Sequence, residues 1–283
     1  MTRSDLIVPA DLDAIERTAV ELAQLAGAEI VTALGTSIAV RYKTSADDAD
    51  SLRDPVSEID HNVESLIRSR LAETFPEHDI IGEEIHERPG SNDDFVWAVD
   101  PIDGTTNFVN GFPIFGASVG VLYRGVPIAG AIWSSFTHRL RAGVYHSRRG
   151  GPLCFDGSRL DPAPNPAVQR RLAGSALIGP DRARWDFRKT GSAAVECALV
   201  AAGILEVARF ASPHIWDVAA GIALVQSAGG AVFSETSGGW TSLDAFELTS
   251  DGAEAVDDLA HWQQPLIVGT ADAAEAMRQL GGH

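Results

Sequence analysis

The stretch Trp97-Ala-Val-Asp-Pro-Ile-Asp-Gly-Thr-Thr-Asn-Phe108 places two carboxylates between the end of a strand and the start of a helix. The apolar run 95–99 is typical of a buried strand, and Pro101 is predicted to end it because proline cannot donate to a strand ladder. Asp100 then lies at the carboxyl end of the strand. Asp103-Gly104 is a turn dipeptide, and the Asp103 side chain is expected to cap a short helix that opens at Gly104. This arrangement predicts a functional site.

The chemistry of this turn suits a phosphate group beside a cation. The first N–H groups of a helix have no partners inside it, so the amides of Gly104, Thr105 and Thr106 could bind an anion. Asp100 and Asp103 could hold a hard divalent cation next to that anion. The alternative is an ordinary acidic turn after a strand, since isolated Asp-Gly turns are common.

Three motifs of the chain, in their order and approximate spacing, resemble those of the inositol monophosphatase family, which are lithium-sensitive, magnesium-dependent phosphomonoesterases. Asp100-Pro-Ile-Asp-Gly-Thr-Thr-Asn-Phe108 is similar to the family signature, and Trp216-Asp-Val-Ala-Ala-Gly221 is similar to its second signature. Gly82-Glu-Glu84 resembles the upstream acidic motif. The resemblance extends from the first predicted helix to about Gly269 and covers most of the chain.

The resemblance sharpens the fold class, which periodicity alone gives only as mixed α/β or α+β. It implies a layered α-β-α-β-α sandwich of the type shared with fructose-1,6-bisphosphatase. A single phosphatase unit would span residues 1–283, with a metal- and phosphate-binding half at about 1–155 and a substrate-side half at about 156–283. The implied metal ligands all offer oxygen atoms, which Mg²⁺, Ca²⁺ and Mn²⁺ prefer. They are Glu83, Asp100, the carbonyl of Ile102, Asp103 and Asp217.

The catalytic residues implied by the resemblance centre on Thr105, which is expected to hydrogen-bond the attacking water. Asp60 or Glu83 would assist it as an orienting group or base. Asp60 has an alternative role, because it follows Ser57 by three residues, and this is the position of a helix-capping acid.

Further candidates lie around this centre. Glu84 adjoins a predicted ligand, and Lys43 begins the polar segment 43–54, where related proteins carry a lysine on a loop near the site. Gly191-Ser192 starts a helix whose N-terminus could face the leaving group. Phe210 stands seven residues before Asp217, where inositol-specific relatives commonly carry a glutamate, so substrate selection is expected to be broad.

Composition and charge limit the class of protein. Of 283 residues, 45% are hydrophobic, which supports a globular core. The net charge of −17 argues against nucleic acid or an anionic membrane as a general partner, because both are polyanions. Two cysteines without metal-ligand spacing argue against a disulfide framework or a zinc site. With no signal-peptide core and no bilayer-length apolar segment, a cytoplasmic protein is expected.

Hydrophobic periodicity and turn residues predict the elements of the chain. Arg124-Gly125 is read as the turn of a hairpin. Arg68 and Arg70 are placed on the outer face of their helix, His138 and His146 are read as exposed strand-end residues, and 181–189 is read as a solvated loop. Helices are predicted over 11–34, 57–75, 191–201, 215–228 and 271–280, and strands over 38–42, 79–82, 115–123, 126–133, 139–145, 151–155, 172–178, 204–210 and 266–268.

Three functions compete on these observations. The preferred one is a magnesium-dependent phosphomonoesterase acting on a small phosphorylated alcohol, chiefly inositol 1-phosphate, with histidinol phosphate, fructose 1,6-bisphosphate or a 3′-phosphonucleotide as alternatives. The others are a calcium-binding structural protein and a regulatory binding protein on the same fold. The resemblance implies two or three Mg²⁺ ions, with Mn²⁺ as a substitute, inhibition by Li⁺ and Ca²⁺, and a homodimer.

Overall fold

Two large sheets organise the protein, for which a computed structural model describes residues 9–34, 40–42, 55–88, 92–162, 165–175, 184–248 and 253–280. Across the first sheet the strands follow chain order: β3 (His78–Gly82), β4 (Asn92–Asp103), β5 (Gly116–Tyr123), β6 (Val126–Ser134), β7 (Gly143–Arg148), β8 (Cys154–Phe155) and β9 (Ser158–Arg159). The second sheet has the order β11 (Trp185–Arg188), β10 (Arg171–Ser175), β12 (Val207–Phe210), β15 (Leu266–Gly269), β13 (Ala231–Thr236) and β14 (Gly239–Ser242).

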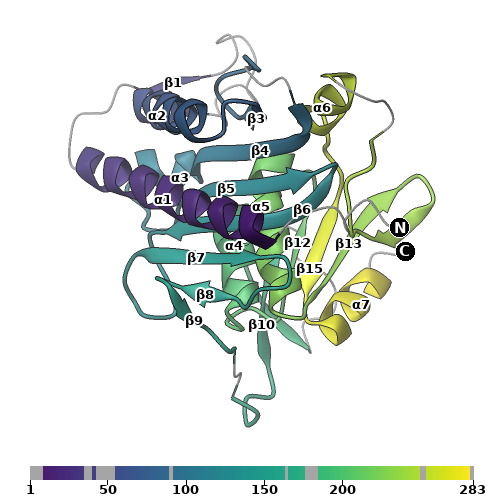
Figure 1. Cartoon of the computed structure of the whole chain (residues 1–283). Helices are drawn as coiled ribbons and strands as arrows, with labels where there is room; N and C mark the ends of the chain where they lie inside the picture. Colours follow the sequence, from purple (N-terminus) through teal and green to yellow (C-terminus); the bar gives the residue numbers. More distant parts are fainter. Residues whose placement is uncertain are drawn as a thin grey trace.

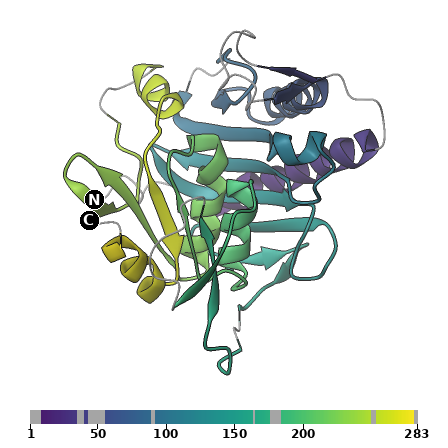
Figure 2. The ribbon, with the colours of Figure 1, turned by 180° about the vertical axis from the view of Figure 1, so that it is seen from behind.

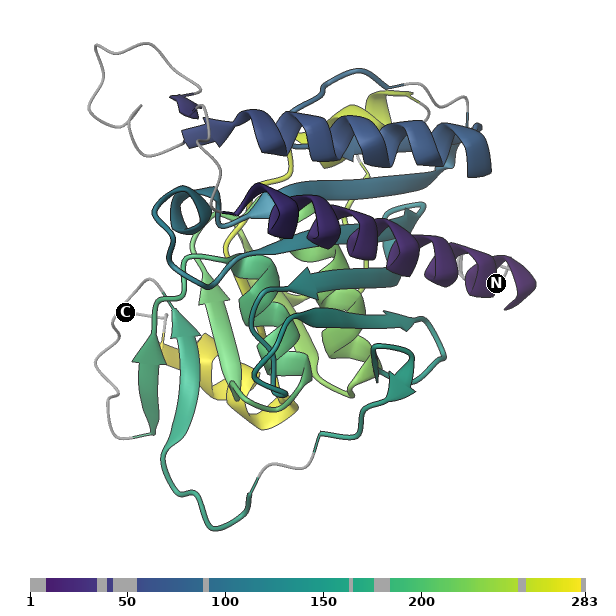
Figure 3. The same ribbon diagram turned by 90° about the vertical axis from the view of Figure 1, so that its left-hand side faces the viewer.

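Helices form the remaining layers. The long helices α1 (Pro9–Ala33) and α2 (Glu58–Thr74) cover one face of the seven-stranded sheet (Figures 1 and 3). Between the two sheets lie α4 (Ala193–Ala201) and α5 (Ile215–Ser227), seen from behind in Figure 2. The outer face of the six-stranded sheet packs against α7 (Ala271–Leu280). One hydrophobic cluster fills each of the two outer interfaces, and a third surrounds the central helices between the two sheets. Five layers therefore alternate, and the predicted α-β-α-β-α architecture is confirmed.

The long periodic segments fold as their sequence predicts. The five predicted helices are present, with boundaries within two residues, because each carries an apolar face that a sheet can bury. At the β5–β6 hairpin, Arg124 and Gly125 have φ angles of 49° and 78°, as the predicted two-residue turn requires. The short elements are β1 (Val40–Tyr42), β2 (Pro55–Ser57), α3 (Thr105–Val109) and α6 (Ala253–Ala260).

Pro101 does not end its strand, contrary to the prediction. Strand β4 continues to Asp103, and its register on β5 shifts between the pairs Asp100–Ser118 and Asp103–Gly116. The irregularity removes Pro101 and Ile102 from the ladder, so the missing N–H of proline leaves no pairing position unfilled.

Several elements in and around the second sheet were not predicted from the sequence. The described part of segment 181–189 includes β11, which pairs in parallel with β10, so the prediction of a solvated loop is wrong there. Trp185 is fully buried, and its indole N–H donates to Glu206 Oε2 at 2.6 Å. Burial of the Trp185 side chain therefore places this segment in the sheet despite the arginines and lysine around it. Strands β13 and β14 and helix α6 were not predicted, and residues 139–142 form a turn rather than the start of a strand.

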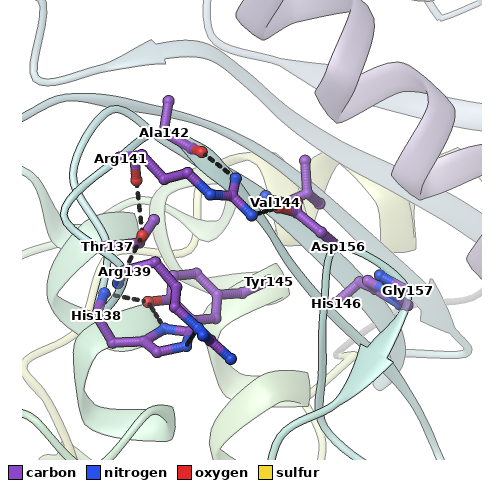
Figure 4. Close-up of polar contacts among 10 residues, drawn as sticks. All are labelled: Thr137, His138, Arg139, Arg141, Ala142, Val144, Tyr145, His146, Asp156 and Gly157. Carbon is purple, nitrogen blue, oxygen red and sulfur yellow. Dashed lines mark hydrogen bonds and ion pairs between the residues drawn. The ribbon is translucent and has the colours of Figure 1, made fainter.

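His138 and His146 are not the exposed residues that the sequence predicted, and both lie among the polar contacts drawn in Figure 4. His146 is buried, and its Nδ1 lies 2.7 Å from Glu16 Oε1 on α1. The half-buried His138 has Nδ1 2.8 Å from the Tyr145 hydroxyl. Burial and the charge of neighbouring arginines lower the pKa of His138.

In the described part of the chain, no helix has the length and apolarity to cross a bilayer.

Candidate active site

Acidic residues from three elements meet where β3 and β4 end and α5 begins. The parallel pairing of β3 with β4 places Glu83, just after Gly82, next to the end of β4. Asp100 on β4 pairs with Ser118 on β5, and the Ser118 hydroxyl donates to the Trp216 carbonyl at 2.9 Å. This hydrogen bond ties the first turn of α5 to the sheet and brings Asp217 toward Asp100.

The grouping of these carboxylates in a buried place raises their pKa values. Asp100 is 2% exposed, and its pKa is raised well above its ordinary value by burial and then by the charges of Glu83, Asp103 and Asp217. Burial also raises the pKa of Asp217, with Asp103 and Glu83 adding to the effect. Asp100 Oδ1 is buried without a hydrogen-bond partner among the residues the structure describes. Such an oxygen lacks a compensating cation or donor.

Asp103 caps a different helix from the one predicted. Its Oδ2 accepts hydrogen bonds from the Ser192 hydroxyl at 2.9 Å and from the Ala194 amide, and its Oδ1 accepts from the Ala193 amide at 3.3 Å. These donors belong to the N-terminus of α4, whereas α3 begins after Gly104 without a side-chain cap. Burial raises the pKa of Asp103 to about 7, although the three hydrogen bonds oppose the shift.

Thr105 and Asp60 are joined, although 45 residues separate them in sequence. The Thr105 hydroxyl lies 3.0 Å from Asp60 Oδ1 and 2.9 Å from the Ile102 carbonyl oxygen. Asp60 is fully buried in the first turn of α2. This contact joins Asp60 to Thr105, and the role of Asp60 in orienting a water or the cation stays a prediction.

The turn around Gly104 is held against the start of α4. Gly104 has a φ of 93°, and a Cβ there would lie 3.2 Å from the Gly191 carbonyl oxygen. Asn107, to which sequence reasoning gave no role, donates to the carbonyls of Thr190 at 2.8 Å and Ile114 at 2.6 Å. The signal was present, because Asn107 belongs to the signature itself. Thr106 is exposed on α3.

A cavity of about 230 Å³ adjoins this turn, and the predicted substrate-side residues meet there. It is lined by Gly191, Ser192, Phe210 and Asp217, together with Lys189, Ala193, Glu196, Arg209, Ala211, Ser212 and Pro213. Glu84 lies at the other edge of the site, and its amide donates to Glu64 Oε2. Lys43 and the segment 43–54 lie outside the described residues.

The donor set fits a hard divalent cation by its chemistry. The side chains are all carboxylates, one oxygen of Asp100 is unsatisfied, and the carboxylates raise one another's pKa. Over the described ranges, the structure contains no group of three or more His, Cys, Asp or Glu residues that already has the geometry of a metal site. The carboxylates are neighbours, with Asp103 turned to the α4 amides and Asp217 Oδ2 accepting from the His214 amide at 2.8 Å.

Comparison with known proteins agrees with the family resemblance of the sequence motifs. The model of the Inositol monophosphatase family matches residues 11–264. The chain belongs to the inositol monophosphatase family. Members of this family are phosphatases that hydrolyse phosphoric monoesters, and the chain is therefore an enzyme of that class.

Individual relatives agree with the family assignment. Phosphatase IMPL1, chloroplastic, of Arabidopsis thaliana is 34% identical, over 82% of this chain and 66% of that protein. The fructose-1,6-bisphosphatase/inositol-1-monophosphatase of Aquifex aeolicus is 32% identical, over 63% of this chain and 71% of that one. The fold also matches an IMPase/NADP phosphatase solved with Mg²⁺ and phosphate, with a TM-score of 0.71, 17% identity and coverage of 95% of each chain. The family is generally metal-dependent.

Proposed function

We propose that this protein is a magnesium-dependent phosphomonoesterase with broad selectivity for small phosphorylated alcohols, inositol 1-phosphate among them. The observation that supports the proposal best is the cluster of Asp100, Asp103 and Asp217, whose pKa values are raised by burial, with the charges of neighbouring carboxylates adding to the shift. A bound divalent cation would favour the charged forms that burial opposes.

The acidic residues of the site would bind the cation. Glu83, Asp100, Asp103, Asp217 and the Ile102 carbonyl would hold two or three Mg²⁺ ions. When bound, Mg²⁺ polarises phosphate oxygens, lowers the pKa of a water and stabilises a departing alkoxide.

Thr105 and Asp60 would prepare the attacking water. Because the Thr105 hydroxyl donates a hydrogen bond to Asp60 Oδ1 at 3.0 Å, the lone pairs of Thr105 Oγ1 are free to accept a hydrogen bond from water. Glu83 would assist as a second orienting group or base. The amides at the start of α3, from Gly104 to Thr106, would hold the phosphate.

The alcohol part of the substrate would occupy the cavity beside α4 and β12. Gly191 and Ser192 line one part of this cavity and Phe210 another. An aromatic ring accepts no hydrogen bond of ordinary strength from a polyol hydroxyl, so Phe210 would weaken discrimination among polyols. The dual name of the Aquifex relative, with which this chain is 32% identical, accords with broad selectivity.

The remaining parts of the proposal concern ions and assembly. Mn²⁺ would replace Mg²⁺ in oxygen sites, whereas Ca²⁺ would inhibit because its larger coordination shell does not reproduce the octahedral geometry. Li⁺ would inhibit because a single charge gives weaker electrostatic stabilisation than Mg²⁺. We expect the working form to be a homodimer in the cytoplasm.

The direct test is release of inorganic phosphate from inositol 1-phosphate and from 2-glycerophosphate. We expect turnover with Mg²⁺, none in EDTA, and inhibition by millimolar Li⁺. Asp217→Asn is expected to remove turnover while the protein stays folded, since its carboxylate is a proposed ligand. Near-normal activity of Asp217→Asn, or turnover that is unaffected by EDTA, would contradict the proposal.

A further inference from the structure

A buried acid lies directly under the loop that carries Glu83. Glu64 on α2 is fully buried, although it is an acidic residue and does not belong to the carboxylate cluster. Its Oε2 accepts the Glu84 amide at 2.7 Å, and its Oε1 accepts the Ile85 amide at 3.1 Å. The two residues that follow Glu83 are therefore fixed to α2 through one carboxylate.

Arg68 completes this arrangement and is not on the outer face where its sequence position placed it. One turn after Glu64, its Nε lies 2.7 Å from Glu64 Oε1, so the buried carboxylate is neutralised. Its two terminal nitrogens donate to the carbonyls of Ile85 and of Glu87, the latter at 2.6 Å. Arg68 therefore binds both the carboxylate and the loop itself.

The residue before Glu83 is packed against the same carboxylate. A Cβ on Gly82 would lie 1.9 Å from Glu64 Oε1, so only glycine leaves room for the carboxylate at this distance. On its other side, the Glu83 amide donates to the Val99 carbonyl of β4 at 3.3 Å. The backbone of Glu83 is thus held between β4 and the Glu64–Arg68 pair.

We propose that Glu64 and Arg68 are positioning residues that hold the Glu83 loop in place and thereby set the affinity of the metal ion that Glu83 binds. This inference rests on the proposed function, because it takes Glu83 to be a ligand. A ligand whose backbone is fixed loses little conformational entropy when the ion binds. Groups that orient the ligands of a metal commonly change its affinity by about 10–100-fold when they are removed.

The experiment uses Arg68→Met and Glu64→Gln, with Arg70→Met as the matched control. Arg70 lies on the same helix and also forms ion pairs, but its partners are the exposed Glu21 and Glu73. Mn²⁺ binding to the metal-free proteins is measured by electron paramagnetic resonance without substrate. Melting curves are recorded first, so that binding is measured at a temperature at which all variants are folded. The Mg²⁺ dependence of phosphate release is then measured on the same proteins.

We expect Arg68→Met and Glu64→Gln to bind Mn²⁺ at least about tenfold more weakly, and Arg70→Met to match the native protein. The Mg²⁺ concentration for half-maximal activity should rise in the first two variants, with kcat at saturating Mg²⁺ largely retained. A purely structural role would lower the melting temperature without changing Mn²⁺ affinity. Should Glu64→Gln fail to fold, Arg68→Met decides alone, because it keeps the buried acid and its two amide contacts.

The outcomes separate this inference from the proposed function. If native protein binds Mn²⁺ and hydrolyses phosphate esters while folded Arg68→Met has native Mn²⁺ affinity, the positioning role is refuted and the proposed function stands. If native protein neither binds Mn²⁺ nor releases phosphate, the proposed function fails and the inference fails with it.

Discussion

The proposed broad choice of substrate rests on a single residue, Phe210. It is half-buried at the end of β12 and lines the cavity next to Ser212 and Asp217. At this position inositol-specific members of the family commonly carry a glutamate. A carboxylate there would accept a hydrogen bond from a ring hydroxyl, and phenylalanine cannot.

The corresponding prediction concerns Phe210→Glu. We expect kcat/KM for inositol 1-phosphate to rise at least about tenfold relative to 2-glycerophosphate, because one well-placed polar partner discriminates strongly between alcohols. Phe210→Leu is the control, since it replaces the ring by a smaller apolar side chain without adding an acceptor. This variant should leave the ratio of the two kcat/KM values nearly unchanged. A native protein that already prefers inositol 1-phosphate a thousandfold over fructose 1,6-bisphosphate, histidinol phosphate and 2-glycerophosphate would contradict this interpretation of Phe210.

At the scale of elements, the site depends on how closely α5 approaches the seven-stranded sheet. A Cβ on Gly120 of β5 would lie 2.6 Å from the Ala220 amide nitrogen, and one on Gly130 of β6 would lie 2.5 Å from the Ala220 carbonyl oxygen. These glycines let the helix backbone rest directly on the sheet. The position of Asp217, one turn earlier on α5, follows from this contact.

Gly130→Ala should therefore affect both stability and metal binding. We expect a loss of about 1–3 kcal/mol in the free energy of unfolding, as is typical when a methyl group is forced into a packed interior. Mg²⁺ affinity should fall as well, because the displaced helix carries Asp217. Gly238→Ala is the matched control: its Cβ would meet only Thr236 Oγ1, at 3.7 Å. Chemical denaturation and calorimetric Mg²⁺ titration measure the two effects, and equal behaviour of the two variants would show that close approach is unimportant.

For the whole molecule, the carboxylate cluster makes stability depend on pH when no metal is bound. The pKa of Asp103 is raised from an ordinary 3.8 to about 7, and those of Asp100 and Asp217 are raised as well. The folded protein therefore binds more protons than the unfolded chain between about pH 4 and pH 7. Because folding takes up protons in this window, the contribution of these groups to stability is present at low pH and is lost as the pH rises through it.

We predict that metal-free native protein loses stability relative to metal-free Asp100→Asn as the pH is raised from 5 to 8. The comparison removes the titration of the rest of the chain, and the difference in Tm should change by roughly 3 °C or more. Adding Mg²⁺ should stabilise the native protein increasingly with pH, since the ion competes with protons for the carboxylates, and should stabilise Asp100→Asn far less. A difference in Tm that does not vary with pH would mean that the cluster is not strained by its own charge.

The sequence alone predicted the five helices by their periodicity and, through the family resemblance, the layered fold; the site residues that it nominated stay predictions. Each of these is local: an apolar face repeats along a helix, and the two signatures and the acidic motif each hold their acids within a few residues. The errors have local causes too. Pro101 was predicted to end β4, but a register shift accommodates it. The cations of 181–189 suggested a solvated loop, although Trp185 in the same segment is buried.

Only the tertiary structure decided which side chains meet. Asp103 caps α4, which begins 90 residues later, and Thr105 contacts Asp60 across 45 residues. Glu64 and Arg68, which carry no recognisable motif, hold the Glu83 loop from another helix. Such contacts depend on how the layers pack, because a buried carboxylate takes whichever donors the packing brings within hydrogen-bonding distance, and periodicity along the chain does not specify those donors.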